Sequence, residues 1–210
     1  MELKCPICRV QACCVEPGVK PYPVFCPMSQ EEEVLHAARA DYTDLATRAL
    51  ASAAARTEAA GYCKETRLQE VMGFARRLGT NRLGIAHCVG LIHEAHLVQE
   101  ILEANHFVVL SVCCKVGSIP KEEIGLEETE KIRPGQYEAL CNPVGQARLL
   151  NKANTGLNIA LGLCVGHDSL FFQHSIAPVT VLVAKDRVTG HNPVAAIYTS
   201  HSYYRRLQEG

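Results

Sequence analysis

The second half of the chain alternates short apolar runs with helical segments, and this alternation limits the possible folds more than any other feature. Each apolar run is nearly continuous, as expected for a strand that is covered on both faces of a sheet. A strand, a helix and a strand in succession favour a right-handed parallel crossover. We therefore predict an α/β fold with an open, mostly parallel sheet of about four strands flanked by helices, the strands lying at 83–89, 107–113, 157–165 and 179–184.

Two Asn-Pro pairs mark the starts of helices between and after these strands. Asn142 suits the N-cap and Pro143 the first helical position of a helix that runs to about residue 150, and Asn192-Pro193 repeats the pattern before a last helix. The other expected features are an amphipathic helix at 91–104, a polar excursion at 115–137 and a short helical turn at 169–174.

The first 80 residues differ from this pattern in composition. Prolines keep residues 1–28 irregular, since proline fixes φ and has no backbone donor. Two helices follow, one from the capping residue Ser29 to about residue 60 and one at 66–78. We expect one compact unit overall, made of a Cys-rich metal-binding segment at 1–28, a helical hairpin at 29–80 and an α/β domain at 81–210.

Charge and hydropathy exclude several classes of partner. The net charge of -1 offers no electrostatic footprint for nucleic acid or an anionic membrane, and no apolar run approaches the roughly 18 residues of a membrane span. Residues 1–10 lack the apolar stretch of a secretory signal. We expect a cytoplasmic protein whose partner is a small molecule or a redox protein, while the oligomeric state is not set by the sequence.

Cysteine is the residue type that departs most from the ordinary. The chain has 11 Cys, and this odd count argues against a complete set of intramolecular disulfides. Some of these thiols suit the role of small buried apolar groups. That role does not account for all of them, so metal ligation or thiol chemistry is the better expectation.

The first group of cysteines lies among the amino-terminal prolines. A C-x2-C pair on a turn lets two thiolates reach one ion, and two more nearby thiolates complete a site for zinc or for an iron-sulfur cluster. Metal binding also supplies folding energy that such a short, irregular segment lacks. The candidate metal ligands are Cys5, Cys8, Cys13, Cys14 and Cys26.

The second group lies at the carboxyl ends of the predicted strands, where ligands bind in open parallel sheets. These candidate cofactor ligands are Cys88, Cys113, Cys114, Cys141 and Cys164. Polar side chains accompany them: His167, Asp168, Lys185, Asp186, Arg187 and His191.

Three interpretations of this second group remain open. The thiolates hold a second zinc or iron-sulfur site, with His167 or His191 as a further ligand. Alternatively, Cys164 is a nucleophile on a strand-to-helix turn, with His167 or His191 as base and Asp168 and Asp186 as polar partners. In the third, the chain is a structural zinc module with one saturated four-thiolate site and ordinary reduced thiols elsewhere. Asp168 then only caps a helix, and the histidines are ordinary loop residues.

Several segments together resemble a known family. They are 83–91, the Ser-Val-Cys-Cys-Lys run at 111–115, Cys141-Asn142-Pro143, the Gly-Leu-Cys-Val-Gly-His-Asp motif at 162–168, and 185–193. They are similar to a bacterial and archaeal domain of unknown function whose members are labelled uncharacterised metal-binding proteins. The resemblance covers nearly the whole chain, including Cys5 and Cys8, and its most specific part is the motif at 162–168. It implies metal binding and no particular activity.

Overall fold

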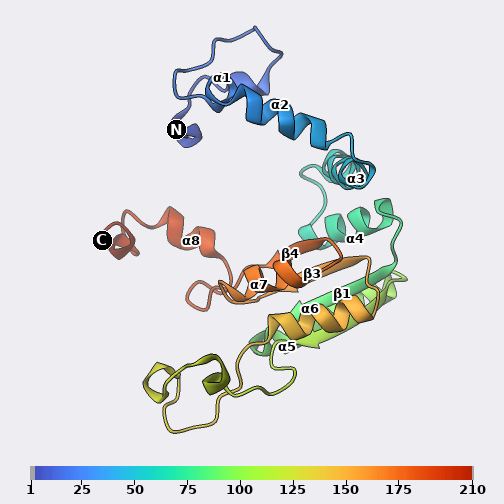
Figure 1. The fold of residues 1–210 in the computed structure, drawn as a ribbon, viewed down its shortest axis with the longest axis vertical. Helices are drawn as coiled ribbons and strands as arrows, with labels where there is room; N and C mark the ends of the chain where they lie inside the picture. The colour runs from blue at the N-terminus through green and yellow to red at the C-terminus, as the bar shows by residue number, and fades with distance from the viewer. Residues whose placement is uncertain (1–2, 210) are drawn as a thin grey trace. The chain divides into compact units, whose positions relative to one another are not determined.

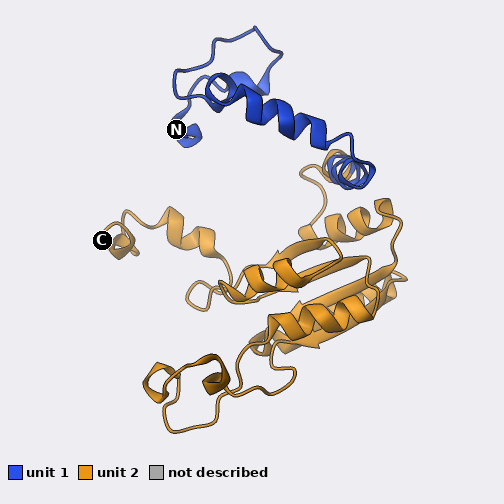
Figure 2. Cartoon of the chain, in the orientation of Figure 1, with its two compact units in different colours: residues 1–56 blue, residues 57–210 orange. Residues whose placement is uncertain are grey.

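The structure is a computed structural model that describes residues 3–209. The chain divides into two compact units, residues 1–56 and residues 57–210, and each unit is described by itself (Figure 2).

The amino-terminal unit is built from short helical segments. They are η1 (Cys5–Ile7), η2 (Ala12–Cys14), α1 (Pro27–Gln30), α2 (Glu32–Asp41) and the larger part of α3 (Leu45–Gly61). The single helix predicted from the capping residue Ser29 to about residue 60 is broken, because the Asp44 carboxylate accepts a bond from Thr47 N at 2.8 Å and so starts a new helix. Ala12 and Ala53 are the buried apolar residues among those described in this unit.

The carboxyl-terminal unit contains one four-stranded sheet (Figure 1). Its strands are β1 (Arg82–His87), β2 (Val108–Cys113), β3 (Leu157–Leu161) and β4 (Val179–Val183). All neighbouring strands are parallel, and their order is β2-β1-β3-β4. The predicted parallel α/β sheet is confirmed. β2 ends at its predicted position, and the other three strands end one to four residues earlier than predicted.

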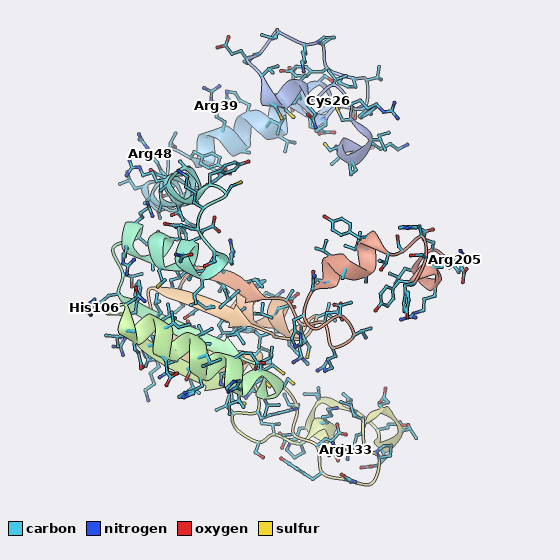
Figure 3. All side chains as sticks on the ribbon, turned by 180° about the vertical axis from the view of Figure 1, so that it is seen from behind. Cys26, Arg39, Arg48, His106, Arg133 and Arg205 are labelled. Carbon is cyan, nitrogen blue, oxygen red and sulfur yellow. The ribbon has the colours of Figure 1, made fainter. Side chains whose placement is uncertain are left out.

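Helices cover both faces of this sheet. The helices of the unit are α4 (Arg67–Arg77), α5 (Ile92–Ala104), α6 (Pro143–Lys152), α7 (His167–His174) and α8 (Pro193–Tyr198). Apolar residues of α4 and α5 form one core cluster with one face of the sheet. Residues of α6 and α7 form another cluster, in which the cysteines that follow β1 and β2 are buried. The turn at His106, labelled in Figure 3, joins α5 to β2.

The chain reverses its direction of travel across the sheet at β1. It leaves β1 for β2 on one side and later enters β3 on the other side, so the carboxyl ends of β1 and β3 flank a topological switch point. In open α/β sheets, ligands bind at such a point. The predicted site residues lie at this edge.

The polar excursion after β2 has a fold of its own. An antiparallel bridge joins Pro120 to Ala139, and the segment carries two short 3-10 helices, η4 (Lys121–Ile124) and η5 (Glu128–Glu130). The Lys131 side chain is only 2% exposed and its ammonium group pairs with Glu122 and Glu128. The remaining short helices are η3 (Val89–Leu91) and η6 (Arg205–Leu207). Within residues 3–209, no helix has the length and apolarity that crossing a membrane requires.

Candidate functional site

Strand geometry brings several predicted cysteines to one edge of the sheet. Cys88 directly follows β1, Cys113 is the last residue of β2, and Cys114 follows it. Cys164 comes three residues after the end of β3. In a parallel sheet these positions share an edge, so four thiols from three strand ends gather there.

Three of the thiols are in direct contact, and we call Cys88, Cys114 and Cys141 the strand-edge cluster. The Cys114 thiol hydrogen-bonds both Cys88 and Cys141. Backbone amides also point at the sulfurs: Val89 N donates to Cys114 Sγ at 3.3 Å, and Gly90 N donates to Cys88 Sγ at 3.4 Å. Cys88 is 5% exposed and Cys114 is 2% exposed, so the cluster is largely removed from water.

Backbone bonds place Cys141 in this cluster although it lies far from Cys114 in sequence. Asn142 N donates to Cys114 O at 2.7 Å, which returns the chain from the polar excursion to the end of β2. The Asn142 side chain then accepts a bond from Gly145 N at 2.8 Å and caps α6, as its sequence predicts. The helix start therefore fixes the position of the thiol just before it.

Gln146 ties the strand ends together beneath the cluster. It is fully buried, and its Nε2 donates to His87 O at 3.1 Å and to Val112 O at 2.6 Å. One side chain of α6 thus bonds the ends of both β1 and β2. This fixes the two segments from which Cys88 and Cys114 project.

A cation accompanies each of three thiols at this edge. Lys185 hydrogen-bonds Cys88, and Lys115 hydrogen-bonds Cys141. Arg187 Nη2 donates to Cys164 Sγ at 3.2 Å. The edge therefore stabilises negative charge on sulfur.

Hydrogen bonding sets different pKa values within the strand-edge cluster. The bond from Cys114 is the main cause that lowers the pKa of Cys88 to about 4, with Gly90 N–H and Lys185 acting in the same direction against burial. The bond from Cys114 likewise lowers the pKa of Cys141, to about 5. The pKa of Cys114 is raised, because it holds the proton shared with its neighbours and is buried. Within the cluster, Cys114 is therefore the hydrogen-bond donor to its two neighbours.

The motif around Cys164 forms the turn into α7. Cys164 O accepts bonds from His167 N at 3.0 Å and Asp168 N at 3.1 Å, so the residues predicted as base and partner begin the helix. His167 Nδ1 is buried and has no hydrogen-bond partner within residues 3–209. The Asp168 carboxylate accepts a bond from Ser169 N, its own neighbour. The group that bonds the Cys164 thiol is Arg187.

Asp186 and His191 organise the loop after β4. The Asp186 carboxylate accepts bonds from Val188 N at 2.9 Å and Thr189 N at 3.1 Å, and bonding in this turn lowers its pKa. His191 Nδ1 accepts from Asp186 N at 3.1 Å. Both side chains therefore hold the loop that carries Arg187. Cys113 is partly buried and packs against the core on the α6 and α7 side.

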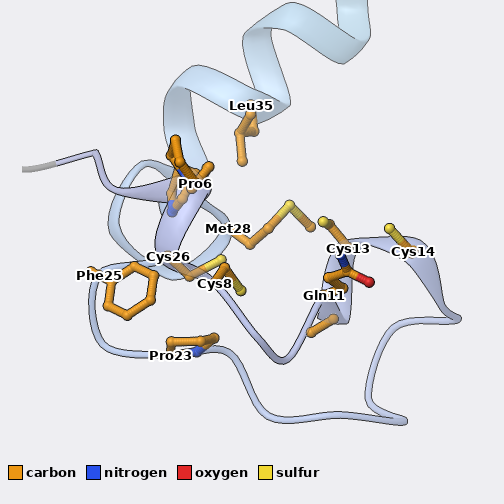
Figure 4. A pocket seen from close by; sticks show the side chains of 13 residues that line it. Pro6, Cys8, Gln11, Cys13, Cys14, Pro23, Phe25, Cys26, Met28 and Leu35 are labelled. Atoms are coloured by element: carbon orange, nitrogen blue, oxygen red, sulfur yellow. The ribbon is translucent and has the colours of Figure 1, made fainter. Parts of the chain in front are cut away.

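The amino-terminal cysteines line a separate cavity within the amino-terminal unit (Figure 4). Its volume is about 460 Å³, and its lining includes all five predicted ligands: Cys5, Cys8, Cys13, Cys14 and Cys26. Figure 4 labels the side chains of Cys8, Cys13, Cys14 and Cys26 among those that line this cavity. Hydrogen bonding to Cys14 raises the pKa of Cys13. Thiols from η1, η2 and the start of α1 thus face one space.

The two thiol groups suit soft metals by their chemistry. Thiolates select zinc, copper(I) and iron-sulfur clusters, and the buried, unpartnered His167 nitrogen at the sheet edge is a free donor of the kind such metals accept. As they stand, no three or more His, Cys, Asp or Glu side chains among residues 3–209 could hold a metal ion between them. In the strand-edge cluster the sulfurs share protons instead.

Two residues at the site were not among those predicted. Lys115 directly follows the cysteine pair at the end of β2, and this position was the available signal. Gln146 lies four residues before Leu150 on the buried face of α6, so a polar side chain among apolar neighbours marked it. Lys115 hydrogen-bonds Cys141, and Gln146 bonds the strand ends next to Cys88 and Cys114.

Comparison with known proteins finds relatives without an assigned activity. The model of a family described as "Protein of unknown function (DUF1847)" matches residues 26–182. The "Uncharacterized protein MJ0455" of Methanocaldococcus jannaschii is 47% identical over 161 residues, which is 77% of this chain and 81% of the relative. No solved structure matches. The matched range contains the strand-edge cluster and Cys164, and it begins at Cys26.

Proposed function

The chain belongs to the DUF1847 family of proteins of unknown function. From the site itself we propose that the protein is a metalloprotein whose strand-edge cluster binds a soft metal through thiolates. The observation that carries this proposal is the contact of Cys114 with both Cys88 and Cys141, three thiols from separate segments at the carboxyl edge of the sheet. The metal is zinc or part of an iron-sulfur cluster.

The chemistry of the cluster supports metal binding in two ways. A thiol must lose its proton to ligate, and the lowered pKa values of Cys88 and Cys141 reduce the cost of that loss near neutral pH. Lys185 and Lys115 hydrogen-bond these two sulfurs, as outer partners of metal ligands commonly do. In this proposal, metal ligation replaces the hydrogen bonds that Cys114 now makes.

The test is metal content after anaerobic purification of the full chain. Elemental analysis and an absorption spectrum of the same sample are compared between the natural sequence and the single variants Cys88→Ser, Cys114→Ser and Cys141→Ser. Each variant is expected to lose the metal of this site. Iron with inorganic sulfide and broad visible absorption identifies a cluster, whereas zinc alone identifies a mononuclear site.

Cys63→Ser is the matched control for these variants. Cys63 is an exposed free thiol in the turn after α3, so its loss should leave the metal content unchanged. If all three cluster variants retain as much metal as the Cys63 variant, the strand-edge cluster is not the metal site.

A second thiolate site lies, on this proposal, at the amino-terminal cavity. The support is that five cysteines line one space in a unit with two buried apolar residues among those described, so a bound metal would supply stability that packing does not. Replacing Cys5 and Cys8 together by serine should lower metal stoichiometry and make residues 3–27 more susceptible to proteolysis. Unchanged metal content would sink this second assignment.

The alternative function is thiol chemistry at Cys164. The observation in its favour is the bond from Arg187 Nη2 at 3.2 Å, since a guanidinium next to sulfur stabilises the thiolate, which is the nucleophilic form. Alkylation of the full chain with iodoacetamide should then modify Cys164 faster than the exposed Cys63, and Arg187→Gln should remove the difference. Equal rates at both thiols in the natural sequence would argue against this function.

A further inference from the structure

One ring nitrogen at the sheet edge lacks a partner. His167 is the first residue of α7, where its backbone N–H donates to Cys164 O at 3.0 Å and fixes the turn. Its Nδ1 is buried and has no hydrogen-bond partner among the described residues. Leaving a polar atom buried and unpaired destabilises the folded state. A buried nitrogen without a partner is a free donor of the kind that soft metals accept.

His167 lies within electrostatic reach of the strand-edge cluster. Its imidazole is one of the groups that lower the pKa of Cys141, after Cys114 and Lys115. Helix α7, which begins at His167, packs against α6, whose start follows Cys141. The ring is therefore close enough to the cluster for its charge to act on Cys141.

Cys164 differs from His167 because its side chain is already satisfied. Arg187 Nη2 donates to its sulfur at 3.2 Å, and the loop carrying Arg187 is held by the bonds of Asp186 and His191. Cys114, by contrast, finds its thiol partners in Cys88 and Cys141. The two candidates for a fourth ligand are therefore the Cys164 sulfur, which has a partner, and His167 Nδ1, which has none among the described residues.

We infer that His167, and not Cys164, is the fourth ligand of the strand-edge site, giving a Cys3His donor set of Cys88, Cys114, Cys141 and His167. This rests on the metal-binding function proposed above. Three thiolates and one imidazole are a closed tetrahedral set of the kind that zinc takes in structural sites, whereas common iron-sulfur clusters are held by four cysteines. Ligation through Nδ1 uses the neutral ring with its proton on Nε2. Cys164 then stays a free thiol held by Arg187.

The experiment titrates the metal-free full chain with Co²⁺, whose thiolate charge-transfer absorption increases with the number of sulfur ligands. Variants are made in a Cys5→Ser, Cys8→Ser background, so that the amino-terminal cavity contributes less to the signal. Cys164→Ser should leave both the Co²⁺ affinity and the charge-transfer intensity unchanged. His167→Gln should weaken binding by more than about 100-fold, the upper range for losing a mere outer partner of a ligand.

His174→Gln is the matched control, because His174 is the last residue of the same helix and is exposed. Far-UV circular dichroism of each variant monitors α7 and the rest of the fold. A fall in charge-transfer intensity on Cys164→Ser would overturn the inference whatever His167→Gln does, and would leave the proposed metal site standing with four thiolates. Unchanged binding in His167→Gln would also overturn it. If Cys88→Ser, Cys114→Ser and Cys141→Ser all leave the Co²⁺ affinity and the charge-transfer intensity unchanged, the proposed site itself is refuted.

Discussion

Replacing Gly84 by alanine should disrupt the pairing of β1 with β3, the two strands that flank the switch point. The register places Gly84 opposite Asn158. A Cβ on residue 84 would lie 2.1 Å from Asn158 Oδ1 and 2.9 Å from a Leu150 methyl carbon. Both neighbours are fully buried. The Asn158 amide cannot move away freely, since Thr155 Oγ1 donates to its Oδ1 and its Nδ2 donates to Ser175 Oγ, both at 2.8 Å.

The magnitude follows from these contacts. Overpacking a close-packed core costs about 1–3 kcal/mol, and displacing a buried amide from its bonds adds about 1 kcal/mol for each bond lost. We expect Gly84→Ala to lower the free energy of unfolding by about 2–4 kcal/mol. In the double variant Gly84→Ala, Asn158→Ala the clash is removed, so the two substitutions should couple by about 1–3 kcal/mol in the stabilising direction.

Urea unfolding of the full chain followed by far-UV circular dichroism measures these free energies. Gly73→Ala in α4 is the control: its Cβ would come within 3 Å only of the Arg77 guanidinium, the mobile end of a side chain. That substitution should be neutral or stabilising by up to about 1 kcal/mol, as expected for glycine in a helix. A Gly84→Ala variant as stable as the natural sequence, or a double variant that merely adds the two single effects, would refute the packing argument.

Two further predictions concern groups next to the site. Gln146→Glu places a carboxylate where a buried amide donates to two strand-end carbonyls. The free energy of unfolding should fall by about 3 kcal/mol or more at neutral pH, and by less in acid, where the carboxyl regains a proton. Equal losses at both pH values would contradict this. Lys131 lowers the pKa of Glu122 and Glu128, so its ion pairs stabilise the polar excursion above the ordinary carboxyl value of 4.5 and are lost as the pH falls below it. At alkaline pH the limit is set by Lys131, whose pKa is raised, so the stabilisation by its ion pairs is lost only as the pH rises beyond 10.5. The protection factors against amide hydrogen exchange in residues 121–138, which correct for the intrinsic pH dependence of exchange, should therefore fall in acid. Lys131→Met should reduce this fall and leave the part due to the Lys121–Glu138 pair. Protection factors that do not vary with pH would refute the role of these pairs.

The sheet could be predicted from the sequence because its information is local. Continuous apolar runs of strand length, separated by helices with Asn-Pro starts, specify parallel strands covered on both faces. The structure confirms four such strands. The break between α2 and α3 was missed, since an alanine-rich stretch has strong helix propensity and the capping carboxylate of Asp44 is one residue among many possible caps.

The strand-end placement of the candidate residues also follows from sequence, since side chains after parallel strands share an edge. Which of them meet does not follow. Cys114 hydrogen-bonds Cys88 and Cys141, although its sequence neighbour Cys113 packs in the same core cluster. The sequence gives strand ends only to within a few residues, so it does not say which member of an adjacent pair meets the other thiols.

The sequence by itself therefore determined the class of fold, the parallel orientation of its strands and the presence of two groups of thiols. Hydrophobic periodicity and residue type are properties of short segments, which is why they could be read locally. Only the tertiary structure decided which thiols share hydrogen bonds, which cation stands beside each sulfur and which nitrogen is left unpaired. These depend on the return of a polar excursion to the end of β2 and on a buried glutamine that joins two strands. Contacts between segments far apart in the chain arise from packing, and no local pattern encodes them.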